Sequence, residues 1–134
     1  MKALIPALLG LLLSVSSFAA PTPVEIKTQT GQIETKGDRY YSYNFGSQWI
    51  NFSRWVDFTL RNTGNHPVHL RGVFIMGSSY WAQSNCPPIL APGQVCLTRV
   101  EFRPWFEGSH HGRLRFAFIN DSIYIDLYGW GVRR

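Results

Sequence analysis

The sequence predicts an all-β fold in which two antiparallel sheets pack face to face as a sandwich. Beyond the N-terminal apolar run, no segment keeps a helical period of apolar residues. Apolar and polar residues instead alternate in short segments that recur about every eight to twelve residues, with Gly, Pro and Asn between them. Each such strand has one apolar face, and several strands can bury those faces together by packing as two sheets.

The first residues of the chain have the features of a secretory signal. Lys2 gives a positive start, the run from Ala3 to Leu13 is mostly apolar, and Ser17 and Ala19 are small residues where a signal peptidase reads the chain. We therefore expect residues 1–19 to be a cleaved signal peptide and the protein to be periplasmic or secreted. The apolar run is too short for a permanent transmembrane helix, so we expect no integral membrane anchor. A retained anchor is the alternative.

Residues 20–39 are predicted to be an N-terminal extension or an edge strand. Val24 and Ile26 alternate with Glu25 and Lys27, which predicts a strand from about Val24 to Gln29. One interpretation is an extra edge strand or a flexible lead-in to the domain. The other is a segment that docks on a neighbouring subunit by strand addition.

The rest of the chain contains five segments with clear alternation. The residues predicted to face the core are Val56, Phe58, Leu60, Val68, Leu70, Thr98, Val100, Phe102, Leu114, Phe116, Phe118, Ile123, Ile125 and Leu127. Turns are predicted from Asn62 to Asn65 and at Asn120-Asp121, and an irregular strand at Gly72. Pro104 ends a strand because proline cannot join the hydrogen-bond ladder. The hydroxyl of a buried Thr98 would need a backbone partner.

Cys86 and Cys96 are the two cysteines of the chain. In an exported protein two cysteines are expected to be oxidised together. The segment between them holds three prolines and one glycine, which favour a turn. A redox-active pair would need a Cys-x-x-Cys spacing with a helix behind it, and this segment offers neither. We therefore predict a structural disulfide.

Six motifs follow one another in the second part of the chain: Tyr43-Asn44-Phe45-Gly46, Phe58-Thr59-Leu60-Arg61-Asn62-Thr63-Gly64, Cys86, Ala91-Pro92-Gly93-Gln94-Val95-Cys96, Val100-Glu101-Phe102-Arg103-Pro104 and Leu127-Tyr128-Gly129-Trp130-Gly131. Their order and spacing resemble the ASPM-SPD-2-Hydin (ASH) domain, whose bacterial relatives are called choice-of-anchor D proteins. The resemblance implies that residues 40–134 form an immunoglobulin-like antiparallel β-sandwich of about seven to nine strands with one disulfide. It also implies a scaffolding or docking role.

The charge of the chain is modest and spread out. Thirteen Lys and Arg residues against eight Asp and Glu residues give a formal net charge of +5. Most of the basic residues are single arginines inside alternating segments, whereas nucleic-acid-binding proteins show a dense basic patch or a named motif. We therefore expect no nucleic acid partner.

The histidines and acidic residues do not predict a metal site. His110 and His111 follow Glu107, and adjacent residues on an extended chain point to opposite sides. A structural zinc site would need four well-placed ligands. We expect a histidine pair in a loop between Pro104 and Gly112, no metal and no cofactor.

No catalytic arrangement can be assembled from the sequence. None of the serines lies in a Gly-x-Ser-x-Gly motif. The acidic residues Asp57, Glu101, Asp121 and Asp126 are predicted to face outward on strands or in turns, as ordinary solvated carboxylates. A nucleophile would need a base and a third group that orients it, so we predict that the protein is not an enzyme.

Aromatic residues make up 15% of the chain and are more numerous than the core requires. The alternation that buries Ile123 and Leu127 places Tyr124, Tyr128 and Trp130 outside, beside the outward residues of the preceding strand. The predicted interface consists of Arg113, Arg115, Tyr124, Tyr128 and Trp130. Tyr, Trp and Arg dominate protein interfaces. Six further aromatics are expected at strand ends or in loops: Trp49, Trp55, Tyr80, Trp81, Trp105 and Phe106. The alternative is that these rings pack under the N-terminal segment or cap the ends of the sandwich.

These observations predict a non-catalytic exported module, an accessory subunit of a bacterial envelope assembly that binds protein partners. The alternative is a carbohydrate-binding domain for peptidoglycan or another glycan, with rings such as Trp81, Trp105 and Tyr128 laid against the sugars. A pilus-type assembly chaperone would need two domains, and the sequence predicts one.

Overall fold

The computed structural model describes residues 21–29, 33–37 and 39–134, and the predicted signal peptide lies outside them. No helix in this part of the chain is long and apolar enough to cross a membrane. The described residues form ten strands: β1 (Val24–Thr28), β2 (Glu34–Gly37), β3 (Tyr40–Trp49), β4 (Arg54–Asn62), β5 (Val68–Met76), β6 (Tyr80–Ser84), β7 (Ile89–Leu90), β8 (Val95–Phe102), β9 (Gly108–Phe118) and β10 (Ser122–Val132).

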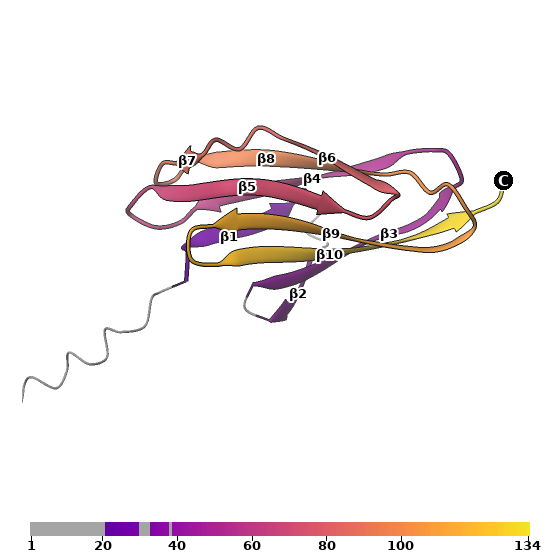
Figure 1. Ribbon diagram of the computed structural model, residues 1–134, viewed down its shortest axis with the longest axis horizontal. Coiled ribbons are helices and arrows are strands. Elements are labelled where there is room, and N and C mark those ends of the chain that lie inside the picture. The colour runs from indigo at the N-terminus through magenta and orange to yellow at the C-terminus, as the bar shows by residue number, and fades with distance from the viewer. Residues whose placement is uncertain (1–20, 30–32, 38) are drawn as a thin grey trace, which may run out of the picture.

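The strands form two sheets, with the order β1-β4-β8-β6 in one and β2-β3-β10-β9-β5-β7 in the other. Figure 1 shows the strands of both sheets running along the long axis of the molecule. Neighbouring strands are antiparallel except β3 and β10, which are parallel. The predicted all-β sandwich is confirmed, and the short strands β2 and β7 bring the number of described strands to ten.

The N-terminal segment contributes a strand to each sheet. The strand predicted between Val24 and Gln29 is β1, which pairs along its whole length with β4, and β2 pairs with β3. Asp121, in the turn before β10, binds two residues of this segment. Its carboxylate accepts a hydrogen bond from the backbone N–H of Thr22 (3.2 Å) and forms an ion pair with Arg39 (3.2 Å).

The core lies between the sheets and contains the residues that the alternation predicts. Those with no exposed surface are Phe58, Thr98, Val100, Phe102, Leu114, Phe116, Ile123, Ile125 and Leu127. The ring of Phe102 lies 5.4 Å from that of Phe45 and 5.1 Å from that of Tyr80, measured between centroids. Gly129 approaches the same ring so closely that a Cβ atom there would lie 2.5 Å from it. Tyr80, expected among the surplus rings at strand ends or in loops, begins β6 but is buried in the core.

β5 changes register in its middle, as Gly72 predicts. The pairing with β9 shifts between Leu70 and Gly72, which is a β-bulge. Before the bulge the inward residues are Val68 and Leu70. After it the inward positions are odd-numbered, so Phe74 points outward and is half exposed. The bulge thus gives the outer face of this sheet an aromatic ring.

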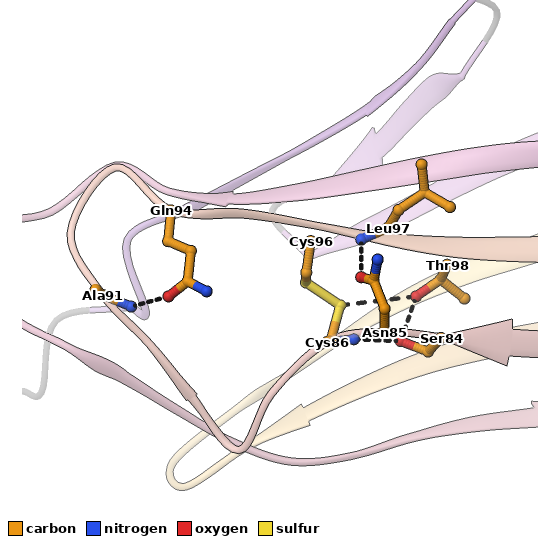
Figure 2. The surroundings of a disulfide bond; sticks show 8 residues. All are labelled: Ser84, Asn85, Cys86, Ala91, Gln94, Cys96, Leu97 and Thr98. Carbon is orange, nitrogen blue, oxygen red and sulfur yellow. Dashed lines mark hydrogen bonds between the residues drawn. A yellow bond between two sulfur atoms is a disulfide. The ribbon is translucent and has the colours of Figure 1, made fainter.

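Cys86 and Cys96 form the predicted disulfide, with a Cα–Cα distance of 4.9 Å. Ser84 of β6 pairs with Thr98 of β8, so the disulfide continues this ladder by a covalent link (Figure 2). The buried hydroxyl of Thr98 donates to the Ser84 hydroxyl at 2.9 Å. Its partner is therefore a side chain and not the backbone group expected from the sequence. The bridge is consistent with an exported protein in an oxidising compartment.

The segment between the two cysteines crosses from one sheet to the other. It leaves β6, adds β7 to the edge of β5 in the six-stranded sheet, and returns to β8. Its turn is closed by hydrogen bonds between Ala91 and Gln94, and the side-chain one is drawn in Figure 2. At Gly93 the backbone has a φ of +79°, which favours glycine.

Asn62 connects this crossing segment to the loop between β4 and β5. Its fully buried side-chain amide donates to the carbonyls of His66 (2.8 Å) and Leu90 (2.9 Å) and accepts from the N–H of Gly64 (2.9 Å). Its backbone N–H and C=O bind Gln94 and Gly93. Five hydrogen bonds from one residue therefore fix three segments of chain.

We predict that Asn62→Ala lowers the free energy of unfolding by about 1–3 kcal/mol for each buried polar group left without a partner, above all the Leu90 carbonyl. Asn62→Asp should cost more at neutral pH, because it places a negative oxygen against two carbonyl oxygens. Urea denaturation measures both. The exposed Asn65→Ala is the matched control, and equal stability of the Asn62→Ala and Asn65→Ala variants would contradict the role of Asn62.

Replacing Cys86 and Cys96 together by Ser should lower the free energy of unfolding by about 2–3 kcal/mol, because the unfolded chain is no longer closed into a short loop. The circular dichroism spectrum of the sandwich should remain. Unfolding of the wild-type protein with and without reductant gives the same comparison without a mutation. If reduction leaves stability unchanged, the bridge does not restrain the crossing segment.

Candidate functional site

The five residues predicted as an interface lie on the outer face of the six-stranded sheet. They come from the neighbouring strands β9 and β10: Arg113, Arg115, Tyr124, Tyr128 and Trp130. In the register of this pair, Tyr124 is opposite Arg115 and Trp130 is opposite Ser109. The structure therefore brings the five side chains onto one face. Their part in binding stays a prediction.

Tyr124 is the middle of a stack that crosses three strands. Its ring lies 5.3 Å from that of Tyr40 on β3, with an angle of 10° between the planes. The guanidinium of Arg113 lies 5.1 Å from the centroid of the Tyr124 ring. Arg113 also donates from Nε to Asp126 at 2.8 Å, and this hydrogen bond raises the pKa of Arg113 above its ordinary value. The stack is held in place before any partner binds.

Tyr128 and Trp130 continue the aromatic face along β10. Tyr128 is 37% exposed and its ring lies 5.0 Å from the imidazole of His111 on β9. Trp130, two residues further on, is 51% exposed. With Tyr40 and Tyr124, they form a row of rings on the outside of the sheet.

Arg115 lies beside a groove that the sequence did not predict. Its guanidinium is 5.6 Å from the ring centroid of Phe74 on β5, and its Nε donates to Ser122 at 3.1 Å. The groove has a volume of about 610 Å³, and Arg71 and Tyr124 also line it. The contribution of Phe74 depends on the bulge at Gly72. The sequence already predicted an irregular strand at Gly72. If the residues after it had been expected to switch to the opposite face of the sheet, Phe74 would have been predicted as an outward-facing residue.

The histidine pair lies on β9 and not in a loop, which corrects the sequence prediction. β9 begins at Gly108, and the alternation of the strand buries His110 and exposes His111. The Nδ1 atom of His110 lies 2.5 Å from the hydroxyl of buried Ser79, and its Nε2 lies 2.9 Å from the carbonyl of Phe106. Both ring nitrogens are used to connect loops, and Ser79 is not accessible as a nucleophile. Among the described residues no three His, Cys, Asp or Glu side chains gather to hold a metal.

Asp57 is buried, although the sequence predicted a solvated carboxylate. It lies on β4 opposite Arg99 of β8, which donates to both of its oxygens, from Nε at 2.8 Å and from Nη2 at 3.0 Å. The hydrogen bond from Arg99 holds the pKa of Asp57 below its ordinary value. An acid held ionised in this way does not serve as a proton donor near neutral pH.

The three rings suggested for sugar binding are not brought together. Trp81 lies on β6 in the four-stranded sheet, Tyr128 on β10 in the six-stranded sheet, and Trp105 in the loop between β8 and β9. Both strand residues are on outward faces, so they look away from each other across the sandwich. One ligand cannot lie against all three.

The comparison with known proteins shows a likeness of fold. No protein-family model and no curated protein matches the chain. The ASH/PapD-like domain of human CEP192 is similar with a TM-score of 0.56 and 14% identity, over 88% of this chain and 92% of that one. A protein of unknown function from Porphyromonas gingivalis W83 has a TM-score of 0.60 and 15% identity, over 84% of this chain and 50% of that one.

Part of a secreted protease has the same kind of fold. VesC, a secreted serine protease from Vibrio cholerae, is similar with a TM-score of 0.54 and 17% identity, over 66% of this chain but only 21% of the protease chain. The chain thus spans half or less of the length of VesC and of the P. gingivalis protein. At these identities the matches show the fold alone. They support the immunoglobulin-like, ASH-type sandwich that the sequence motifs resemble.

Asp57→Asn should lower stability at neutral pH and have a diminishing effect in acid. Because Arg99 lowers the folded-state pKa of Asp57 below the ordinary 3.8, the ion pair stabilises the fold above about that pH and is lost as the pH falls through the lowered value. Urea denaturation of wild type and variant at neutral pH and in acid measures this difference. Glu107→Gln, at an exposed ion pair, is the control. If the difference in stability between wild type and Asp57→Asn stays constant into strong acid, the ion pair with Arg99 does not account for the stabilising effect of Asp57.

Proposed function

We propose that this protein is a non-catalytic interaction module of the bacterial cell envelope, periplasmic or secreted, and an accessory subunit that binds a protein partner. The observation that supports this function is the outer face of the six-stranded sheet. Its aromatic rings come from three strands, β3, β5 and β10. Tyr40, Phe74, Tyr128 and Trp130 are exposed, and Tyr124 between them is partly buried. Arg113 and Arg115 stack on two of these rings.

Such a face has the composition of a protein interface. Interface cores are enriched in Tyr, Trp and Arg and depleted in Lys and Glu. Soluble monomers seldom leave a large apolar patch unused. The ring stack at Tyr124 and the ion pair between Arg113 and Asp126 already order the side chains, so binding would lose less side-chain entropy than it would with mobile side chains.

The charge around the groove favours a partner with an acidic segment at this position. Arg71 and Arg115 both line the groove. The acidic residue that lines it, Asp121, already pairs with Arg39. A carboxylate from the partner would therefore meet two guanidinium groups, which bind carboxylates in a bidentate geometry.

The fold neighbours fit this proposal without specifying the partner. The ASH/PapD-like domain of human CEP192 matches over nearly its whole length, whereas the matches to proteases involve a small part of those chains. This supports a module of the ASH type in place of a catalytic domain. A single sugar-binding surface of Trp81, Trp105 and Tyr128 is not favoured, because these residues lie on different parts of the molecule.

The test is association in the native envelope. We predict that Arg115→Ala combined with Tyr128→Ala abolishes co-purification and chemical crosslinking with the native partner, while circular dichroism shows an unchanged fold. The matched control combines Arg103→Ala with Trp105→Ala, an exposed arginine and ring in the loop after β8. It should retain the partner. Association that survives in a folded Arg115→Ala/Tyr128→Ala variant would place the interface elsewhere.

A further inference from the structure

The outer face of the four-stranded sheet carries two exposed tryptophans on either side of a carboxylate. Trp55 on β4 and Trp81 on β6 are both paired with Glu101 on β8, which lies between them. The tryptophans are 57% and 50% exposed. Because neighbouring strands are about 5 Å apart, the backbones of the two tryptophans are separated by about 10 Å.

A second row of side chains lies next to the first. Asp57, Arg99 and Gln83 are paired in the same order across β4, β8 and β6. Arg99 is held from two sides, by the ion pair with Asp57 and by the ring of Trp55 at 5.3 Å. The guanidinium has five N–H donors, and two of them bind Asp57.

The first row, with Arg99 and Gln83 of the second, lines a groove of about 370 Å³. Its lining includes Trp55, Trp81, Gln83, Arg99 and Glu101, together with Ser53, whose hydroxyl donates to Glu101. The groove thus has an aromatic side wall at each end and hydrogen-bonding groups between them. An ionised carboxylate only accepts hydrogen bonds, a guanidinium only donates them, and an amide does both.

We propose that this groove binds a carbohydrate, a short segment of an uncharged, β-linked glycan. The flat face of a sugar ring presents C–H groups with a small positive charge, which are attracted to the negative face of an indole ring. Equatorial linkages keep the chain of sugars extended, so that one ring can lie on Trp55 and a ring further along the glycan on Trp81.

Hydroxyl groups fit the centre of the groove better than apolar groups do. Each sugar hydroxyl can donate to Glu101 and accept from Arg99. An apolar ligand would cover these groups without satisfying them, at a large cost in desolvation. The two charged groups that line the groove, Glu101 and Arg99, have opposite signs, so the lining favours neither an acidic nor a basic ligand and suits an uncharged glycan.

The site binds without cleaving. The Asp57 carboxylate is occupied by Arg99 and stays ionised, so Glu101 has no acidic partner with which to form the acid–base pair of a glycoside hydrolase. This inference is independent of the proposed protein interface, which lies on the other sheet.

The test uses the purified protein with two uncharged tetrasaccharides, β-1,4-linked glucose and β-1,4-linked N-acetylglucosamine. NMR titration should shift the indole N–H signals of Trp55 and Trp81 with at least one of them. Trp55→Ala and Trp81→Ala should each weaken binding by about tenfold. The controls Trp105→Ala and Trp130→Ala remove exposed rings elsewhere and should leave the affinity unchanged.

Glu101→Gln separates a polar site from simple ring stacking. It keeps the shape of the side chain but replaces one acceptor oxygen with a donor, so the affinity should fall, while Glu107→Gln should not change it. The proposal is overturned if neither sugar binds, or if binding does not depend on Trp55 and Trp81. It is also overturned if these two tryptophans are needed for a protein partner and sugars do not bind, since the groove would then be a protein-docking surface.

Discussion

The hydrogen bonds of Asn62 are the constraint on which the joining of the two sheets depends. Where β4 ends, the chain passes to β5 in the other sheet, and the segment after β6 later crosses the same boundary to form β7. These crossings turn backbone polar groups toward an interior that water does not reach, where each needs a partner. The side-chain amide of Asn62 has two donor N–H groups and an acceptor oxygen, and it forms hydrogen bonds with three of these backbone groups. A leucine would fill the space and leave those groups unsatisfied, so the apolar core can close here because a polar residue occupies the site.

The parts of the fold that the sequence predicted are those in which one strand can be interpreted by itself. When one face of a strand is buried, its residues are apolar and those of the other face are polar. A few alternating residues are therefore enough to identify the inward face. β4, β8, β9 and β10 therefore have the predicted inward residues, from Val56 to Leu127. The inward residues of β5 were predictable only up to Gly72. A bulge there moves the later residues to the opposite face of the sheet, and alternation alone does not show how many extra residues a bulge contains. The disulfide followed from the number of cysteines, whereas β2 and β7 are too short to carry a pattern.

The sequence could not predict environments that depend on which strands are neighbours. Asp57 is buried because Arg99 lies opposite it on β8, and residues far apart in the chain have to meet for this to happen. His110 is a core residue because Ser79 and the Phe106 carbonyl lie within hydrogen-bond distance of its ring. Trp55 and Trp81 belong to one groove only because β8 lies between β4 and β6. For the outer face of β9 and β10, in contrast, a single tight turn joins the strands, and the five predicted residues do share a surface.

The parallel pairing of β3 with β10 has a consequence for how the chain folds. Tyr43 pairs with Leu127, and β4 to β9 all lie between them in the sequence. Contacts between such distant segments form late, since a long loop must close before they contribute any stability, and folds rich in them are slow to form. During synthesis, β2 and β3 leave the ribosome before β10 does. Until β10 arrives, the edge of β3 that will pair with it exposes unpaired backbone groups to any other strand nearby. This is therefore the interval in which the emerging chain is most open to wrong strand pairing.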